Sequence, residues 1–101
     1  MVALLAFGIG LRRVNELFAV SARGGKLRLL RGRMPQALFA ELADIAERDQ
    51  LDAIEWRVVS EGGAPRLLLA GTPHAAAEQA ARNVLGRYNL SQIRNGRLRA
   101  R

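Results

Sequence analysis

Two similar segments decide the fold of this chain. Residues 18–35 read FAVSARGGKLRLLRGRMP, and residues 54–73 read IEWRVVSEGGAPRLLLAGTP. Each segment holds two stretches with alternating apolar residues around a Gly-Gly pair. This pattern is typical of a β-hairpin, because glycine readily adopts the positive φ angles of a tight turn. The same distance, 38 residues, separates the two Gly-Gly pairs and the two prolines that follow them, Pro35 and Pro73.

A helix is predicted after each hairpin. The first starts near Pro35 and runs to about Arg48, because the chain there repeats apolar residues at the spacing of one helix face. The residues of this stripe are Leu38, Leu42, Ile45 and Ala46. The second helix is predicted to begin with Thr72 as N-cap and Pro73 at its first position, and to end at Gly86.

These elements predict an α+β fold of duplicated ββα units (ββαββα). Its core would be a four-stranded, mainly antiparallel sheet with two helices on one face, formed by residues 18–93. Residues 1–17 are an apolar and basic N-terminal segment, predicted to contain a short apolar helix. Residues 94–101 are a basic tail that we expect to fray.

The N-terminal segment has the composition of a membrane-interacting stretch. Residues 1–11 are apolar apart from two glycines, and Arg12 and Arg13 follow. As a helix this run is about 16 Å long, whereas a bilayer core is about 30 Å thick. Two alternatives remain. The segment is a short interfacial helix with Leu11, Arg12 and Arg13 at the membrane surface, or it is the stub of a spanning helix with both arginines on the cytoplasmic side.

Charge is unevenly distributed along the chain. The net charge is +7, of which residues 1–33 contribute +6, residues 34–86 contribute −4 and residues 87–101 contribute +5. Basic ends favour anionic partners such as lipid headgroups or nucleic acid, although a need for solubility also explains them. The chain has no cysteine, which excludes disulfides, thiol catalysis and thiolate metal sites.

The sheet face opposite the helices, called the open face below, is the candidate binding surface. Strand alternation places five basic side chains on it: Arg23, Lys26, Arg28, Arg57 and Arg66. Glu55 is its one acid, and Leu30, Val59 and Leu68 are interleaved. Such a face suits an anionic partner, another protein or a second copy in a homodimer, and a terminal segment could also cover part of it.

No group of residues points to catalysis. His74 is the single histidine and has no nucleophile or metal ligand at a suitable spacing. Gly8 and Gly10 lack the third glycine of a dinucleotide-binding loop. We therefore predict no catalytic residue, no cofactor, no metal and no small-molecule substrate, and we expect that the protein is not an enzyme.

Several strings resemble the bacterial family called domain of unknown function 3634. They are RVNELFAVS at 13–21, GKLRLLRGRMP at 25–35, Arg66-Leu67 with Gly71, and QAARNVLG at 79–86. The resemblance covers about residues 12–94. It implies a short protein with one N-terminal membrane helix and a small domain after it, and it implies no known activity.

The sequence thus predicts a non-enzymatic bacterial interaction domain, tethered by its N-terminus to the cytoplasmic side of the inner membrane. The alternative is a soluble cytoplasmic nucleic-acid-binding module that uses the basic sheet face. The alternation places Phe18 and Trp56 on the helix-facing side. That placement leaves the open face without the aromatic platforms that single-strand binders use.

Overall fold

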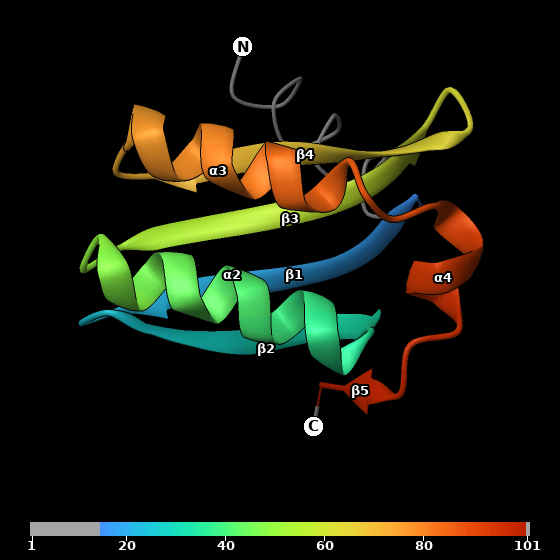
Figure 1. Cartoon of the computed structure of the whole chain (residues 1–101), viewed down its shortest axis with the longest axis horizontal. Helices are drawn as coiled ribbons and strands as arrows, with labels where there is room; N and C mark the ends of the chain where they lie inside the picture. The colour runs from blue at the N-terminus through green and yellow to red at the C-terminus, as the bar shows by residue number, and fades with distance from the viewer. Residues whose placement is uncertain (1–14, 101) are drawn as a thin grey trace, which may run out of the picture.

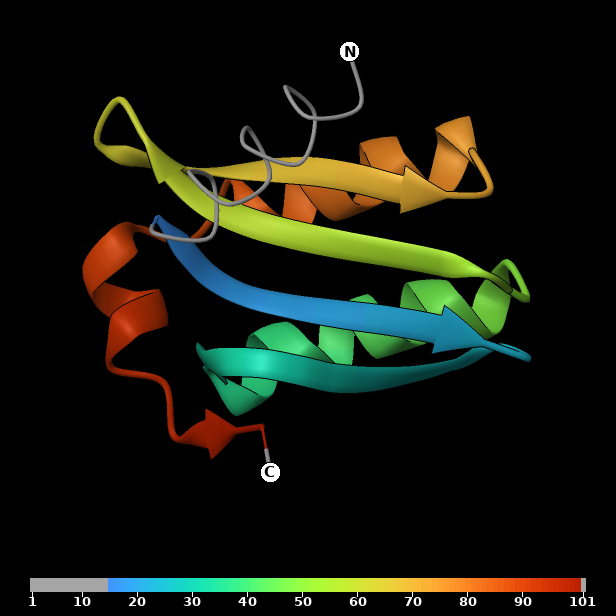
Figure 2. The ribbon, with the colours of Figure 1, turned by 180° about the vertical axis from the view of Figure 1, so that it is seen from behind.

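The fold is α+β, with one antiparallel sheet that carries two helices side by side on a single face (Figures 1 and 2). The computed structural model describes residues 15–100. The strands are β1 (Glu16–Arg23), β2 (Lys26–Met34), β3 (Ile54–Glu61), β4 (Ala64–Gly71) and β5 (Leu98–Arg99). The helices are α2 (Gln36–Arg48), α3 (Ala75–Leu85) and α4 (Leu90–Arg94). The strand order is β4-β3-β1-β2-β5, so the N-terminal strand β1 lies at the centre of the sheet.

Both Gly-Gly pairs form the predicted tight turns. Arg23 pairs with Lys26 and Glu61 pairs with Ala64, so each loop holds only its two glycines. All four glycines have φ between 56° and 79°. Pro65 lies outside the second turn, because it pairs with Ser60 inside β4, an edge strand that tolerates a residue without an N–H.

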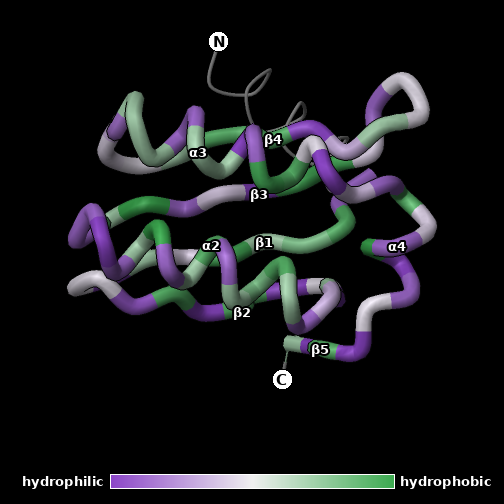
Figure 3. Tube along the Cα trace, in the orientation of Figure 1, coloured by the Kyte–Doolittle hydropathy of each residue, from purple (hydrophilic) through white to green (hydrophobic). Residues whose placement is uncertain are grey.

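The core lies between the sheet and the helices α2 and α3. Trp56 and Leu29 flank Val20 in one row across the sheet, and all three contribute to the same apolar cluster. The predicted stripe of α2 is confirmed, since the buried residues of that helix are Leu38, Leu42, Ile45 and Ala46. Along α2 the hydrophobic and hydrophilic colours alternate with the turns of the helix (Figure 3). The helix α2 therefore buries one side and leaves the other to solvent.

The helix α3 begins later than the sequence indicated. His74, and not Thr72, is its N-cap, and Pro73 lies outside the helix. The His74 Nδ1 accepts a hydrogen bond from the Ala77 amide at 3.1 Å, while the His74 amide donates to Glu78 Oε2 at 2.8 Å. An imidazole nitrogen thus accepts the capping hydrogen bond that a hydroxyl or carboxylate oxygen usually accepts at this position.

The C-terminal region adds elements that were not predicted. The sheet has five strands and the described chain has three helices, where four strands and two helices were expected. The short helix α4 starts with a capping box in which Asn89 and Gln92 each accept the other's amide hydrogen at 2.8 Å. Ile93 is fully buried and anchors this helix. Leu98 then pairs with Met34, so part of the segment expected to fray is a strand.

Candidate anion-binding face

The candidate face is the side of the sheet that carries no helix, seen in Figure 2. The five predicted basic residues come from four strands and lie on this face: Arg23 from β1, Lys26 and Arg28 from β2, Arg57 from β3 and Arg66 from β4. Their strand neighbours of opposite parity belong to the apolar core. The structure thus places the five side chains on one face but divides them into two groups.

Two of the five are paired with acids. Arg57 Nε donates to Glu55 Oε2 at 2.6 Å, and Arg66 forms an ion pair with Glu61. The first pair is partly shielded from solvent, while the second is well exposed. These partners reduce the positive charge that β3 and β4 offer to an anion.

A further arginine joins the centre of the face. Arg31 Nε donates to Glu16 Oε1 at 2.8 Å, and Arg31 Nη2 lies 3.6 Å from Glu55 Oε2. That Nη2 is buried without a hydrogen-bond partner among the described residues. Together with Arg57, these groups form an ion-pair network over β1, β2 and β3. The network is electrically balanced, so it holds the strands together and leaves little charge for a ligand.

A β-bulge explains why Arg31 was not predicted here. Ala19 pairs with Arg31, but the next residue, Val20, pairs with Leu29. Leu30 is therefore the extra residue, and the parity of β2 changes after it. Strict alternation assigned Leu30 to the open face and therefore placed Arg31 on the opposite face. Nothing in the local sequence signals such a shift.

The remaining three predicted residues form a cationic group near the first hairpin. Arg23, Lys26 and Arg28 are exposed, and none of them makes an ion pair within residues 15–100. They border a shallow groove of about 480 Å³ on the open face. Its lining residues are Ser21, Arg23, Lys26, Leu27, Arg28, Leu30 and Glu55. This group is the most available positive charge of the predicted set.

The open face is not uniformly exposed. Ala19 is fully buried between its cross-strand partners Arg31 and Arg57, and Val59 is only 4% exposed. Val59 was predicted to be a surface residue of this face. The charged side chains on either side of Ala19 are much longer than its methyl group, and such chains cover apolar surface with their methylene stems.

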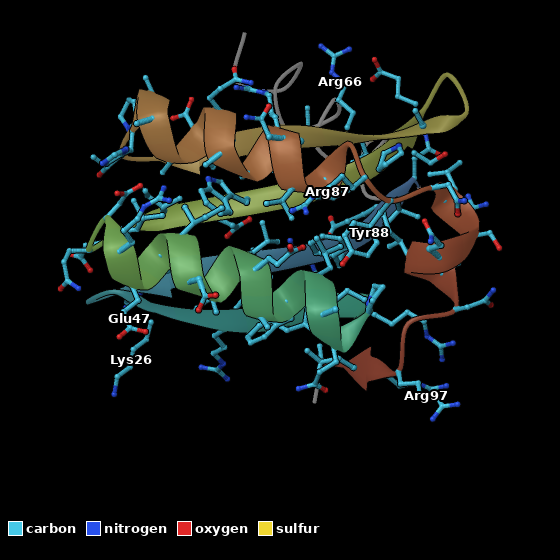
Figure 4. All side chains as sticks on the ribbon, viewed as in Figure 1. Lys26, Glu47, Arg66, Arg87, Tyr88 and Arg97 are labelled. Carbon is cyan, nitrogen blue, oxygen red and sulfur yellow. The ribbon has the colours of Figure 1, made fainter. Side chains whose placement is uncertain are left out.

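The pairing of β5 extends the basic surface to the edge of the sheet. Arg33 and Arg99 are direct cross-strand partners, and Arg33 Nη1 donates to the Arg94 carbonyl at 3.5 Å. Lys26 and Arg97 project away from the fold at opposite ends of this edge (Figure 4). The basic stretch before residue 34 and the basic tail, far apart in sequence, therefore meet along β2.

The helix side carries the opposite charge. Residues 36–52 contain five acids and one base, whereas β2 contains four bases and no acid. On this side the Arg48 guanidinium donates to Asp49 and lowers the pKa of that carboxyl. Burial raises the pKa of the Tyr88 hydroxyl, and nearby Glu41 raises it further. The molecule therefore has an acidic helix side and a basic sheet edge.

Other site predictions concern His74 and the N-terminal segment. His74 caps α3, and no cluster of three His, Asp or Glu residues suited to a metal ion occurs in residues 15–100. The predicted apolar helix and the candidate interface residues Leu11, Arg12 and Arg13 lie outside the described residues. Within residues 15–100, every helix is too short or too polar to cross a bilayer.

Comparison with known proteins identifies one relationship. No curated protein and no solved structure matches the chain. A family model described as "Protein of unknown function (DUF3634)" matches residues 1–97, which is nearly the whole chain. This match agrees with the strings quoted from the first hairpin and the second helix. The chain therefore belongs to the DUF3634 family of proteins of unknown function.

Proposed function

We propose that this protein is a non-enzymatic interaction domain, held at the cytoplasmic face of a bacterial inner membrane by its N-terminal segment. Its basic sheet face and edge would lie against anionic lipid headgroups. The observation that carries the proposal is the separation of charge between the acidic α2 side and the basic strand β2. A domain with one acidic and one basic side turns its basic side toward an anionic surface.

Three basic residues near the first hairpin, which make no ion pair within residues 15–100, support this orientation. Arg23, Lys26 and Arg28 are exposed, and juxtamembrane basic residues each contribute about 1 kcal/mol to binding an anionic bilayer. Arg57 and Arg66 contribute less, because Glu55 and Glu61 partly neutralise them. Leu11, Arg12 and Arg13 would supply the attachment itself.

Vesicle binding tests the orientation. A triple variant, Arg23→Gln with Lys26→Gln and Arg28→Gln, should bind anionic phosphatidylglycerol vesicles about a hundredfold more weakly. The reason is that removing the three charges costs about 3 kcal/mol of binding free energy in total. The matched control carries the same charge change on the helix side: Arg48→Gln, Arg82→Gln and Arg87→Gln. It should bind nearly as well as the unaltered protein. Equal losses in both variants would overturn the proposed orientation.

Cell fractionation tests the attachment separately. The full-length protein should sediment with the membranes and stay there at high salt, because apolar insertion is not screened by ions. Recovery entirely in the soluble fraction would refute the tether. This measurement does not depend on which face of the sheet meets the headgroups.

Nucleic-acid binding remains the second proposal, supported by the same basic face. It would use Arg23, Lys26, Arg28, Arg57 and Arg66, and binding to RNA or DNA would weaken steeply with salt. Among the described aromatic residues, Phe18 and Trp56 are buried in the helix-side core and offer no stacking platform. Absence of any retention on single- or double-stranded polymers at low salt would end this proposal.

We also infer that the two ββα segments are copies of one unit. The order β1-β2-α2 followed by β3-β4-α3 supports this, as does the constant offset of 38 residues between Gly24 and Gly62 and between Pro35 and Pro73. The central pairing of β1 with β3 would then relate the halves by an approximate twofold axis. Profiles built from each half alone should detect the other half in family members, and failure to do so would contradict a duplication.

A further inference from the structure

The outer edge of β2 is only partly covered. On its inner side β2 pairs with β1 from Lys26 to Gly32. On its outer side β5 pairs with Arg33 and Met34, and the Ala100 amide donates to the Gly32 carbonyl at 3.1 Å. Among residues 15–100 no strand pairs with the outer side of residues 26–31. Figure 1 shows β5 beside one end of β2 only.

An uncovered strand edge can accept a further strand. Its outward N–H and C=O groups lack partners, and main-chain hydrogen bonds to an extended peptide satisfy them. In this protein β5 already occupies one end of the edge in an antiparallel direction. A peptide that continues the line of β5 would therefore lie along residues 26–30.

A notch marks the place where β5 ends. It has a volume of about 260 Å³ and is lined by residues of both strands: Arg28, Leu29, Leu30, Arg99 and Ala100. Two of its lining residues are arginines, the other three are apolar, and none is acidic. A carboxylate placed here would meet Arg28 on one side and Arg99 on the other.

The charge of the edge selects the partner. The sequence contains no acid between residues 17 and 40 or between residues 79 and 101, so both strands of this edge are purely basic. A second copy pairing through the same edge would bring Lys26 and Arg28 against like charges, which is unfavourable. An acidic strand would instead place carboxylates beside these side chains on the open face.

On the helix side of this edge, the bound peptide would need apolar side chains. Leu27 and Leu29 are half-buried and pack against the rim of the core. Successive side chains of a strand point to opposite faces of the sheet. The complementary peptide therefore alternates acidic residues, toward Lys26 and Arg28, with apolar residues, toward Leu27 and Leu29.

We propose that the outer edge of β2 binds an extended peptide segment of alternating acidic and apolar residues, added antiparallel in line with β5. The notch between Arg28 and Arg99 holds one of its carboxylates. This interaction goes beyond the function proposed above, because it needs neither a membrane nor the N-terminal segment. It assigns the domain a protein partner of defined chemistry.

Fluorescence anisotropy with labelled peptides of about eight residues tests the proposal. The parent peptide alternates Glu and Val. One control has the same composition with its glutamates grouped together, and a second carries N-methyl groups on alternate amides, which remove backbone donors. The parent should bind at least about tenfold more tightly than either control, because strand addition needs both the alternation and the amides. Equal binding of all three would show charge attraction only and would overturn the proposal.

Protein variants locate the site. Arg28→Gln and Arg99→Gln should each weaken the parent peptide about tenfold, since charge-assisted hydrogen bonds are lost. Arg82→Gln, on α3, is the matched control and should leave binding unchanged. Amide exchange should slow at residues 26–30 when peptide is bound. Exchange protection elsewhere, or tighter binding of an oligonucleotide than of the parent peptide, would count against the edge as a peptide site.

The two proposals fail independently. The peptide assay contains no lipid, so loss of vesicle binding leaves it unaffected. Conversely, failure of every peptide to bind at low salt would refute the peptide site at the edge of β2. It would not change the result of membrane fractionation.

Discussion

Arg33 and Arg99 lie directly opposite each other in the antiparallel pairing of β2 and β5, the only ladder that ties the C-terminal region of residues 15–100 to the sheet. Two like charges in this position repel each other. The ladder forms nevertheless, because Leu98 packs beside Met34 on the core side and Gly96 approaches the β2 backbone closely. The apolar and backbone contacts therefore outweigh the repulsion.

Reversing one charge of this pair should stabilise the fold. We expect Arg99→Glu to raise the free energy of unfolding by about 0.5 kcal/mol at low salt, since it replaces a repulsive cross-strand pair with an attractive one. Urea unfolding followed by the fluorescence of the single tryptophan, Trp56, measures the change. Arg97→Glu makes the same change in net charge without a cross-strand partner and should give a smaller effect. A loss of stability in Arg99→Glu would contradict the expectation.

Gly96 should be intolerant of any side chain. A Cβ at this position would lie 2.1 Å from the Met34 carbonyl carbon and 2.3 Å from the Pro35 nitrogen. Both are backbone atoms, so the tail must move, and we expect Gly96→Ala to cost about 1–3 kcal/mol. Hydrogen exchange at the Ala100 amide should accelerate, because its bond to Gly32 depends on the docked tail.

Gly86→Ala is the matched control for that substitution. Gly86 has a helical φ of −62°, and a Cβ there would meet nothing closer than 3.4 Å. Alanine restricts the unfolded chain, so this variant should be more stable by about 0.5 kcal/mol. If both glycine variants lost stability equally, close approach at Gly96 would not be the cause.

The structure and the sequence pattern assign the N-cap of α3 to different residues, His74 and Thr72. His74→Ala removes the acceptor of the Ala77 amide and should cost about 1 kcal/mol of stability, while His74→Asn should retain most of it. Thr72→Ala should change stability by less than about 0.5 kcal/mol. Urea unfolding of the three variants decides the matter. A larger loss in Thr72→Ala than in His74→Ala would assign the cap to Thr72 instead.

Tyr88 should titrate above the ordinary range of a tyrosine. Burial and the neighbouring Glu41 both raise the pKa of its hydroxyl above its usual value. The folded protein therefore holds its proton more tightly than the unfolded chain. The associated stability is complete below the unfolded pKa and is lost as the pH rises through the folded one.

The single tyrosine makes this measurement direct. Tyrosinate absorbance in the near ultraviolet should show a raised midpoint in the native protein, and Glu41→Gln should lower that midpoint part of the way. Tyr88→Phe should remove the corresponding loss of stability at alkaline pH. A native midpoint equal to that in concentrated urea would contradict the expected shift.

Local sequence patterns predicted those features that depend on neighbouring residues. The Gly-Gly turns follow from backbone sterics, and the stripe Leu38–Ala46 follows from helix periodicity, so both could be predicted. The position of Arg31 could not, because the bulge after Ala19 reflects how two strands fit together, which no single strand encodes. β5 was missed because two residues are too few for a periodic signal.

The candidate site shows the same limit. Alternation placed Arg57 and Arg66 on the correct face, yet it could not show that Glu55 and Glu61 would pair with them. It also gave no sign that Arg99 would lie beside Arg33, since their sequence separation is large and the pairing depends on how the tail packs. The α4 capping box between Asn89 and Gln92 was a readable signal that the prediction did not use.

The central position of β1 has a mechanical consequence. Force applied through the chain that precedes Glu16 acts along a strand that is hydrogen-bonded to β2 on one side and to β3 on the other. Both ladders would be loaded in shear, with their bonds sharing the strain. β5, held by two residue pairs, would instead peel away first under tension. A pull from the N-terminal end would therefore be resisted by the pairing of β1 with both β2 and β3.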